Sequence, residues 1–158
     1  MNSPIRIIEA VPGDAPRLTG LFDGYRRFYG RPTESEAAGR FLRRRLERGE
    51  SVIFVADLAG SPAGFAQIYP SFDSIELDKV LILHDLFVEP GARRCGVARA
   101  LMEAVRQYGE TVGACGISLA TAIDNDRAQA LYEQLGYQRD ERFLHYFLAL
   151  SGGGRDEQ

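Results

Sequence analysis

Residues 80–101 read VLILHDLFVEPGARRCGVARAL, and this stretch decides how the chain folds. Val80–Val88 is apolar apart from one histidine and one aspartate, which is typical of a central strand covered on both faces. The Pro-Gly pair at 90–91 turns the chain out of the strand, and a helix is predicted from Val97. The stretch therefore predicts a strand, a short glycine-bearing loop and a helix.

The loop between this strand and this helix has the features of a phosphate site. The start of a helix presents unpaired N–H groups at the positive end of the helix dipole. Gly96 and Ala98 leave room for a ligand, and Arg93 and Arg94 add forked donors suited to phosphate oxygens. A solvated basic loop on a structural strand–helix unit stays open as the alternative. The sequence contains neither the P-loop pattern nor the dinucleotide-binding glycine pattern.

Composition limits the class of protein. A chain of 158 residues is enough for one domain, predicted over residues 4–150 with a flexible tail at 151–158. A net charge of −3 argues against a nucleic-acid partner, and the sequence has no apolar run long enough to predict a membrane segment. Cys95 and Cys115 are interpreted as reduced thiols, so we expect a cytoplasmic protein.

Strands and helices alternate along the rest of the chain. The predicted elements are a strand at 5–10, a helix after Asp14, a helix from the capping box at Thr33–Glu36 to Arg48, a hairpin at 51–70, a polar loop at 71–79, a strand at 115–122, a helix at 126–135, and strands at 137–139 and 143–150. The order β-α-α-β-β-β-α-β-α-β-β predicts an α/β fold. Its mixed, mostly antiparallel sheet has about seven strands, with helices on both faces.

Two motifs in this order resemble the GNAT family of N-acetyltransferases. Arg93–Ala98 fits the family signature [Q/R]-x-x-G-x-[G/A], and NDRAQALYEQLGY at 125–137 is similar to its second signature. The resemblance covers nearly all of residues 5–150. It implies a single-domain GNAT fold and an acyl-CoA-dependent N-acetyltransferase, in a branch resembling small-amine, amino-acid and histone-type enzymes.

The resemblance also implies where acetyl-CoA binds, with no metal. Its pyrophosphate would lie on loop amides, and its pantetheine arm would lie in a gap between strands 80–88 and 115–121. The Leu86 N–H would face the thioester oxygen and stabilise the developing oxyanion. The implied coenzyme-binding residues are Phe87, Val88, Arg93, Arg94, Cys95, Gly96, Val97, Ala98, Asn125 and Ala128.

Two side chains are candidates for proton transfer. Tyr132 would protonate the departing thiolate as general acid; its alternative role is a core aromatic. His84 would deprotonate the amine, directly or through water, and its alternatives are a water chain as base or a buried structural histidine. Polyamine-acetylating relatives carry an acidic residue at the position of His84, which weakens a polyamine assignment here.

The sequence gives little information about the amine acceptor. Tyr25, Phe28 and Tyr29 would border its pocket, although core packing is the favoured interpretation for at least two of them. The expected reaction is direct attack of a primary amine of a small molecule or peptide on acetyl-CoA in a ternary complex. Another acyl-CoA, or a non-catalytic acyl-CoA sensor, is the alternative. The apolar strand at 143–150 also predicts a possible homodimer through the C-terminal strands.

Overall fold

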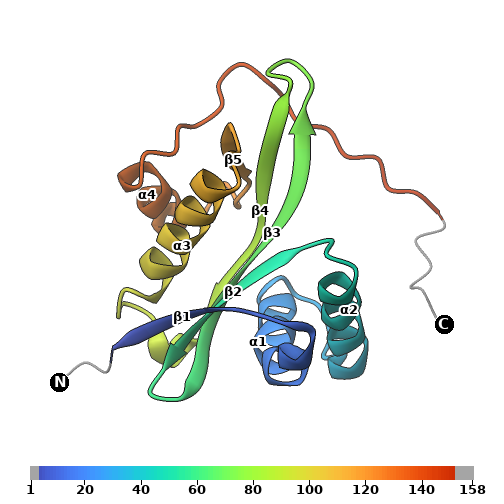
Figure 1. The fold of residues 1–158 in the computed structure, drawn as a ribbon, viewed down its shortest axis with the longest axis vertical. Coiled ribbons are helices and arrows are strands. Elements are labelled where there is room, and N and C mark those ends of the chain that lie inside the picture. Colours follow the sequence, from blue (N-terminus) through green and yellow to red (C-terminus); the bar gives the residue numbers. More distant parts are fainter. Residues whose placement is uncertain (1–3, 152–158) are drawn as a thin grey trace. The chain divides into compact units, whose positions relative to one another are not determined.

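The computed structural model describes residues 4–151 (Figure 1). It divides into two compact units, one up to Ala120 and one from Thr121 onward. The first unit contains β1 (Ile5–Glu9), η1 (Pro12–Asp14), α1 (Ala15–Phe28), α2 (Ser35–Glu47), β2 (Val52–Leu58), β3 (Ser61–Asp73), β4 (Asp78–Val88), η2 (Pro90–Ala92), α3 (Val97–Thr111) and β5 (Gly116–Leu119). The second unit contains α4 (Asp126–Gln134).

The first unit is built on one mixed sheet with the strand order β1-β2-β3-β4-β5. The first four strands pair antiparallel in sequence order, and β5 joins β4 in parallel. The parallel pair needs a crossover connection, which α3 provides. The predicted α/β class and mixed, mostly antiparallel sheet are therefore confirmed, with five strands among residues 4–151 rather than about seven.

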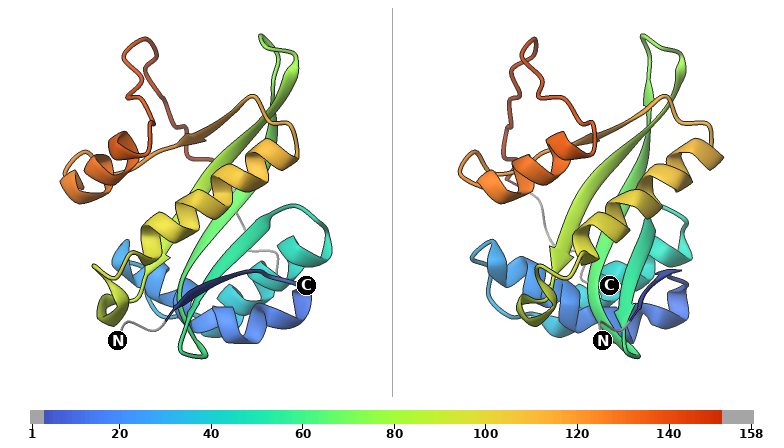
Figure 2. Two further views of the ribbon diagram at one scale, coloured as in Figure 1. Left: turned by 60° about the vertical axis from the view of Figure 1, so that its left-hand side comes forward. Right: turned by 90° about the vertical axis from the view of Figure 1, so that its left-hand side faces the viewer.

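Helices cover both faces of this sheet (Figure 2). On β2, Ile53 and Val55 join the core cluster beneath α1 and α2. Phe54 lies between them in sequence and packs on Tyr108 of α3, with ring centroids 5.8 Å apart. Because successive side chains of a strand point to opposite faces, α1 and α2 cover one face and α3 the other.

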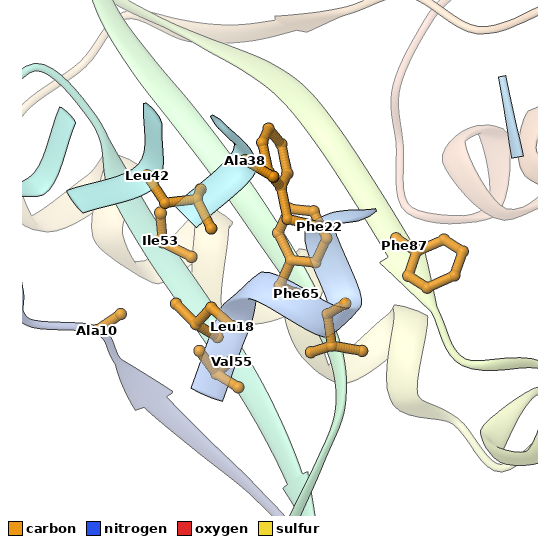
Figure 3. Close-up of a cluster of buried hydrophobic side chains, with 10 residues drawn as sticks. Ala10, Leu18, Phe22, Ala38, Leu42, Ile53, Val55, Phe65 and Phe87 are labelled. Carbon is orange, nitrogen blue, oxygen red and sulfur yellow. The ribbon is translucent and has the colours of Figure 1, made fainter. Parts of the chain in front are cut away.

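The core beneath α1 and α2 is made of tightly buried side chains (Figure 3). Leu42 of α2 and Ile53 of β2 are 1% and 0% exposed. Phe22 of α1 packs edge-on against Phe65 of β3, with ring centroids 6.0 Å apart. Each such side chain contributes roughly 1.5–3 kcal/mol through burial, so this cluster fixes α1 against the sheet.

The start of α2 differs from the predicted capping box. The helix begins at Ser35, and no side-chain hydrogen bond caps its first turn among the described residues. The Asp23 carboxylate of α1 instead accepts a hydrogen bond from the Glu34 N–H, with a distance of 3.0 Å. A tertiary contact has replaced the local cap that Thr33 was predicted to provide.

The polar loop predicted at 71–79 is mostly strand. β3 continues to Asp73 and β4 begins at Asp78, so only residues 74–77 connect them. The Asp73 carboxylate accepts hydrogen bonds from the N–H groups of Ile75 and Glu76, which closes a tight turn. Polar side chains on an exposed hairpin end explain why the sequence was interpreted as a loop.

The last two predicted strands are absent from the structure as described. Residues 137–139 and 143–150 form no strand pairing within the part of the chain that the structure describes. Phe147 and Leu148 are 93% and 80% exposed, although the stretch is apolar apart from His145. A strand requires a hydrogen-bonding neighbour as well as a suitable sequence, and the apolar pattern alone does not supply one. No helix within residues 4–151 is long and apolar enough to cross a bilayer.

Candidate functional site

The second half of β4 is shaped by a β-bulge at His84. Ile68 of β3 lies opposite Leu83, and Gln67, the residue before it, lies opposite Asp85. His84 therefore has no counterpart on β3. A bulge of this kind bends a strand and re-aims its side chains, and it occurs often beside functional sites.

The bulge changes which face of the sheet the strand presents to each helix. Before it, Leu81 lies on the α3 side, next to Gly109 of that helix. After it, Phe87 lies on the opposite side and packs on Tyr25 of α1, with ring centroids 6.5 Å apart. In a regular strand these two side chains would share one face. The bulge at His84 is the break that moves the later residues toward α1.

β4 is also paired differently along its length. Its parallel pairing with β5 runs from Val80–Gly116 to Leu83–Leu119 and ends there. From Asp85 to Val88 the strand pairs only with β3, within the part of the chain that the structure describes. Beyond Leu83 this edge of β4 has no strand partner among the described residues, because β5 ends at Leu119. The splaying of the two strands around a pantetheine arm stays a prediction.

The bulge brings His84 and Asp85 into contact. The His84 Nδ1 and the Asp85 Oδ1 are 3.0 Å apart. The His84 side chain is 64% exposed, whereas Asp85 is only 4% exposed. The buried carboxylate is also held from β3, because Gln67 Nε2 donates to its Oδ2 at 2.5 Å.

Two tyrosines border this pair. Tyr25 of α1 donates a long hydrogen bond of 3.5 Å to the His84 carbonyl, and the Tyr69 ring lies edge-on to the imidazole at 5.4 Å. Burial, reinforced by the Asp85 charge, raises the pKa of Tyr69 to about 12. Burial and the charge and hydrogen bond of Asp85 raise the pKa of Tyr25 well above its usual value. Both phenols therefore stay protonated near neutral pH.

The loop after β4 has the backbone of an anion site. Arg94 and Gly96 adopt left-handed conformations, with φ of 64° and 84°. Gly96 is the N-cap of α3, and no side-chain hydrogen bond caps this helix among the described residues. The first N–H groups of a helix have no intrahelical partner. The loop therefore presents bare backbone donors at the positive end of a helix of 15 residues.

The side chains of the loop divide into exposed and buried ones. Arg93, Arg94 and Cys95 are exposed, whereas Val97 is 1% exposed and anchors the start of α3 in the core. The Arg93 Nε donates to the Val88 carbonyl at 3.1 Å. This hydrogen bond ties the loop to the end of β4. The loop is therefore held against the strand while its donors remain accessible.

Leu86, Phe87 and Val88 lie after the bulge, opposite Ala66, Phe65 and Gly64 of β3. The Phe87 side chain is buried in the core, so any role in ligand binding falls to its backbone. A Cβ on Gly64 would lie 2.7 Å from the Phe87 carbonyl oxygen. Glycine at this position is what lets β3 and the end of β4 approach closely.

Asn125, Ala128 and Tyr132 lie in the second unit, on or next to α4. Asn125 is the N-cap of α4, and its Oδ1 accepts a hydrogen bond from the Ala128 N–H at 3.2 Å. The half-buried Tyr132 ring lies 6.0 Å from that of Tyr137. The cap is a structural role for Asn125, and the coenzyme-binding and acid roles of these residues stay predictions.

The aromatic residues at the end of α1 are only partly core. Tyr25 is half-buried and packs against the cluster, as predicted for a core residue. Phe28 and Tyr29 are 58% and 53% exposed, so the core interpretation is wrong for these two. The helix ends at Phe28, so its buried stripe stops before these side chains reach the sheet. They contact each other with ring centroids 5.2 Å apart.

Sequence reasoning missed three residues of this site, namely Gln67, Tyr69 and Asp85. Gln67 and Asp85 are 0% and 4% exposed. Each lies in a mostly apolar stretch of its strand, and a buried polar side chain requires a partner. The need of a buried polar side chain for a partner could have predicted that Gln67 and Asp85 contact each other. Their register across the bulge could not be read from the sequence.

The chain belongs to the GNAT family. The model of the Acetyltransferase (GNAT) family matches residues 18–137. The predicted enzyme class, an acyl-CoA-dependent N-acyltransferase of the acetyltransferase kind, is confirmed by this match and by the relatives described next.

Three relatives illustrate the similarity. The uncharacterized N-acetyltransferase YhfO of Bacillus subtilis is 41% identical over 144 residues, which are 91% of this chain and 97% of YhfO. A crystal structure of a probable acetyltransferase superposes with a TM-score of 0.87 at 38% identity, covering 92% of this chain and 98% of that one. The aminoglycoside N-acetyltransferase AAC(6')-Iy in complex with CoA shares the fold, with a TM-score of 0.79, 24% identity, and 95% and 98% coverage.

Proposed function

We propose that this protein transfers an acetyl group from acetyl-CoA to a primary amine of a small molecule, by direct attack in a ternary complex. One observation carries the proposal. The uncapped start of α3 and its left-handed loop directly follow the half of β4 that β5 leaves unpaired. A phosphate site and a free strand edge in succession fit the two ends of a coenzyme with a pyrophosphate and an amide-bearing arm.

The loop residues fit a pyrophosphate. The positive φ of Gly96 turns successive N–H groups outward, and its missing side chain leaves the backbone open to close approach. Arg94 is exposed beside it and adds a cationic, forked donor. The residues proposed to hold the pyrophosphate are Arg93, Arg94, Cys95, Gly96, Val97 and Ala98.

The free edge of β4 is proposed to hold the pantetheine arm and the reacting carbonyl. Acetyl-CoA supplies an acetyl group activated as a thioester. The backbone of Phe87 and Val88 binds the amides of the arm, and the N–H of Leu86 donates to the carbonyl oxygen as negative charge develops there. A preorganised donor at such a position is typically worth about 3–4 kcal/mol.

His84 and Tyr132 are proposed to move protons. An alkyl ammonium must lose a proton before it can attack, and the exposed imidazole of His84 accepts it. Tyr132 returns a proton to the departing sulfur. Asn125 and Ala128 are also proposed to contact the coenzyme, and Tyr25, Phe28 and Tyr29 are proposed to border the acceptor.

The acceptor is proposed to be a small-molecule amine. AAC(6')-Iy is an aminoglycoside N-acetyltransferase, so the fold accommodates an amine of this kind in that protein. Residues 4–150 are proposed to act together as the acetyltransferase domain. Cys95 and Cys115 are both exposed free thiols, which fits the reducing cytoplasm as the proposed location.

A homodimer through the C-terminal segment is also proposed. Residues 143–150 carry exposed apolar side chains, among them Phe147 and Leu148 at 93% and 80%. Burying them against a second copy would remove apolar surface from water. Sedimentation should give a dimer, and a monomer at every concentration tested would contradict this assembly.

Titration of CoA into the wild type and Gly96→Val tests the coenzyme site. The variant places a β-branched residue at φ of 84°, a strain of about 1–3 kcal/mol. We expect CoA binding to weaken by about 10–100-fold as the loop gives up this conformation. Gly49→Val is the matched control, because Gly49 has φ of 62°, has open space around it and follows α2. It should show similar strain and unchanged CoA affinity. Equal affinities in all three proteins would contradict the site.

A further inference from the structure

We propose that Asp85 is a positioning residue for His84. Its carboxylate holds the imidazole with the hydrogen on Nδ1, which leaves the lone pair of Nε2 exposed to the acceptor amine. This inference deepens the proposed function, because the role of His84 as a base rests on it. Sequence spacing alone does not suggest the pair, since neighbouring residues of a regular strand point to opposite faces.

The bulge is what makes the contact possible. Because His84 has no counterpart between Ile68 and Gln67 on β3, its side chain is released from strict alternation. Its Nδ1 then lies 3.0 Å from the Asp85 Oδ1, which is hydrogen-bonding distance. A second consequence of the bulge is that Asp85 faces α1, where its carboxylate is buried.

The carboxylate is held so that it cannot turn away from His84. Gln67 Nε2 donates to Oδ2, the oxygen that does not face the imidazole. The Tyr25 hydroxyl of α1 donates to the neighbouring His84 carbonyl, with a distance of 3.5 Å. With Oδ2 held by Gln67, Oδ1 faces Nδ1. A carboxylate that accepts a hydrogen bond from one ring nitrogen commonly sets both the tautomer and the ring orientation of a histidine.

The chemistry of the two groups determines the tautomer. An ionised carboxylate only accepts hydrogen bonds, so the shared hydrogen lies on Nδ1. Nε2 then carries a lone pair on a ring that is 64% exposed. The Tyr69 ring lies next to the imidazole, with an angle of 82° between the two ring planes. In the reaction, Nε2 takes one proton from the ammonium, Nδ1 keeps its own, and the Asp85 carboxylate stabilises the imidazolium.

The other titratable and charged groups near the pair come from the surrounding elements. Tyr25 belongs to α1 and Tyr69 to β3, and both remain protonated near neutral pH because burial and the Asp85 charge raise the pKa of each phenol. Arg45 of α2 and Glu50 after it act on Tyr69 with opposite signs. Within the described residues, Asp85 is the carboxylate in contact with the imidazole.

Long-range proton–nitrogen NMR of the histidine-labelled protein reads the tautomer directly, without any activity measurement. The chain has two histidines, and His145→Gln assigns their signals. At a pH above the histidine titration range, we expect the hydrogen of His84 on Nδ1. In Asp85→Ala we expect it on Nε2, the position that an imidazole without a partner prefers. A wild-type His84 with its hydrogen on Nε2 would overturn the proposal.

A matched control separates this effect from loss of a buried charge. Asp23 of α1 is also 4% exposed, and its carboxylate accepts a hydrogen bond from the Glu34 N–H. Asp23→Asn should leave the His84 tautomer unchanged. If Asp85→Ala does not fold, Asp85→Asn replaces it, and circular dichroism establishes that the variant compared is folded. Retention of the Nδ1 hydrogen in the folded Asp85 variant would overturn the proposal.

Kinetic measurements distinguish the positioning role of Asp85 from the base role of His84 on which it rests. His84→Gln should lower kcat by about 100-fold, the lower range for a positioned general base, and Asp85→Asn should lower kcat with little change in KM for acetyl-CoA. Asp85→Glu should recover part of the loss. Full activity in Asp85→Asn, with His84→Gln impaired, would overturn the positioning role and leave His84 as base. Full activity in His84→Gln would remove the base role and the proposal with it, whereas acetyl transfer would stand.

Discussion

The two halves of β4 belong to one continuous strand but differ in their pairing and packing. Residues 78–83 pair with β3, and Val80–Leu83 also pair with β5, while Leu81 packs on α3. Residues 84–88 begin with the bulge, pair with β3 alone from Asp85 onward and carry a buried aspartate. The difference shows that the strand supports the fold in its first half and offers a backbone edge and polar groups in its second. The end of the pairing with β5 and the unpaired residue His84 produce that change.

The largest expected effect comes from Gly64, which lets β3 approach the second half of β4. Gly64→Val would place a Cβ 2.7 Å from the Phe87 carbonyl oxygen and 3.1 Å from Val97. Neither the backbone nor the buried valine can move freely, so we expect destabilisation of about 3 kcal/mol or more by chemical unfolding. Gly20→Ala, in open space on α1, is the control and should be neutral or slightly stabilising. Equal stability of the two variants would show that β3 does not fix this half of the strand.

Leu81 tests the first half. The residue is 1% exposed and lies next to α3, so Leu81→Ala should lower the free energy of unfolding by about 2–5 kcal/mol. CoA affinity of the folded variant should equal that of the wild type, because this half provides no ligand edge. A calorimetric titration that shows weaker binding in proportion to the lost stability would contradict the division of the strand.

Gln67 tests the polar network of the second half. Gln67→Leu removes the donor to Asp85 Oδ2 and leaves a buried carboxylate oxygen without that bond, which costs about 1–3 kcal/mol. Unlike Leu81→Ala, it should also lower kcat, since Asp85 is then free to turn. Normal turnover in a destabilised Gln67→Leu protein would limit this residue to a structural role.

Tyr69 provides the smallest effect, a dependence of stability on pH. The pKa of Tyr69 is raised to about 12, so the folded state keeps a proton that the unfolded state loses above about pH 10. Its contribution is complete below the unfolded pKa and is lost as the pH rises toward 12. Alkaline unfolding curves should therefore fall less steeply in Tyr69→Phe. Identical slopes in both proteins would contradict the raised pKa.

Much of the fold followed from sequence pattern because it depends on local chemistry. The glycine that precedes α3 and the α4 boundary at Gly136 reflect backbone preferences of single residues. The apolar run of β4 indicated a central strand for the same reason. The hairpin turn predicted at 59–62 is shorter, because Ser61 and Pro62 already belong to β3. Family resemblance then added the coenzyme and the reaction, which no periodicity shows.

The features that escaped prediction depend on distant partners. The bulge at His84 is defined by the register with β3, and the sequence of β4 alone does not show which residue lacks a counterpart on β3. The start of α2 depends on Asp23 of α1. Residues 143–150 have the composition of a strand, but composition does not state which strand lies beside them.

Hydrogen exchange with and without CoA tests most directly the claim that the second half of β4 and the loop before α3 form the coenzyme site. The wild-type protein should show slower exchange at residues 84–88 and 93–98 when CoA is bound, because their free N–H groups gain a partner or lose contact with water. Exchange at residues 80–83, which are paired on both sides, should not change. Protection confined to other parts of the chain, or equal protection of both halves, would contradict the account.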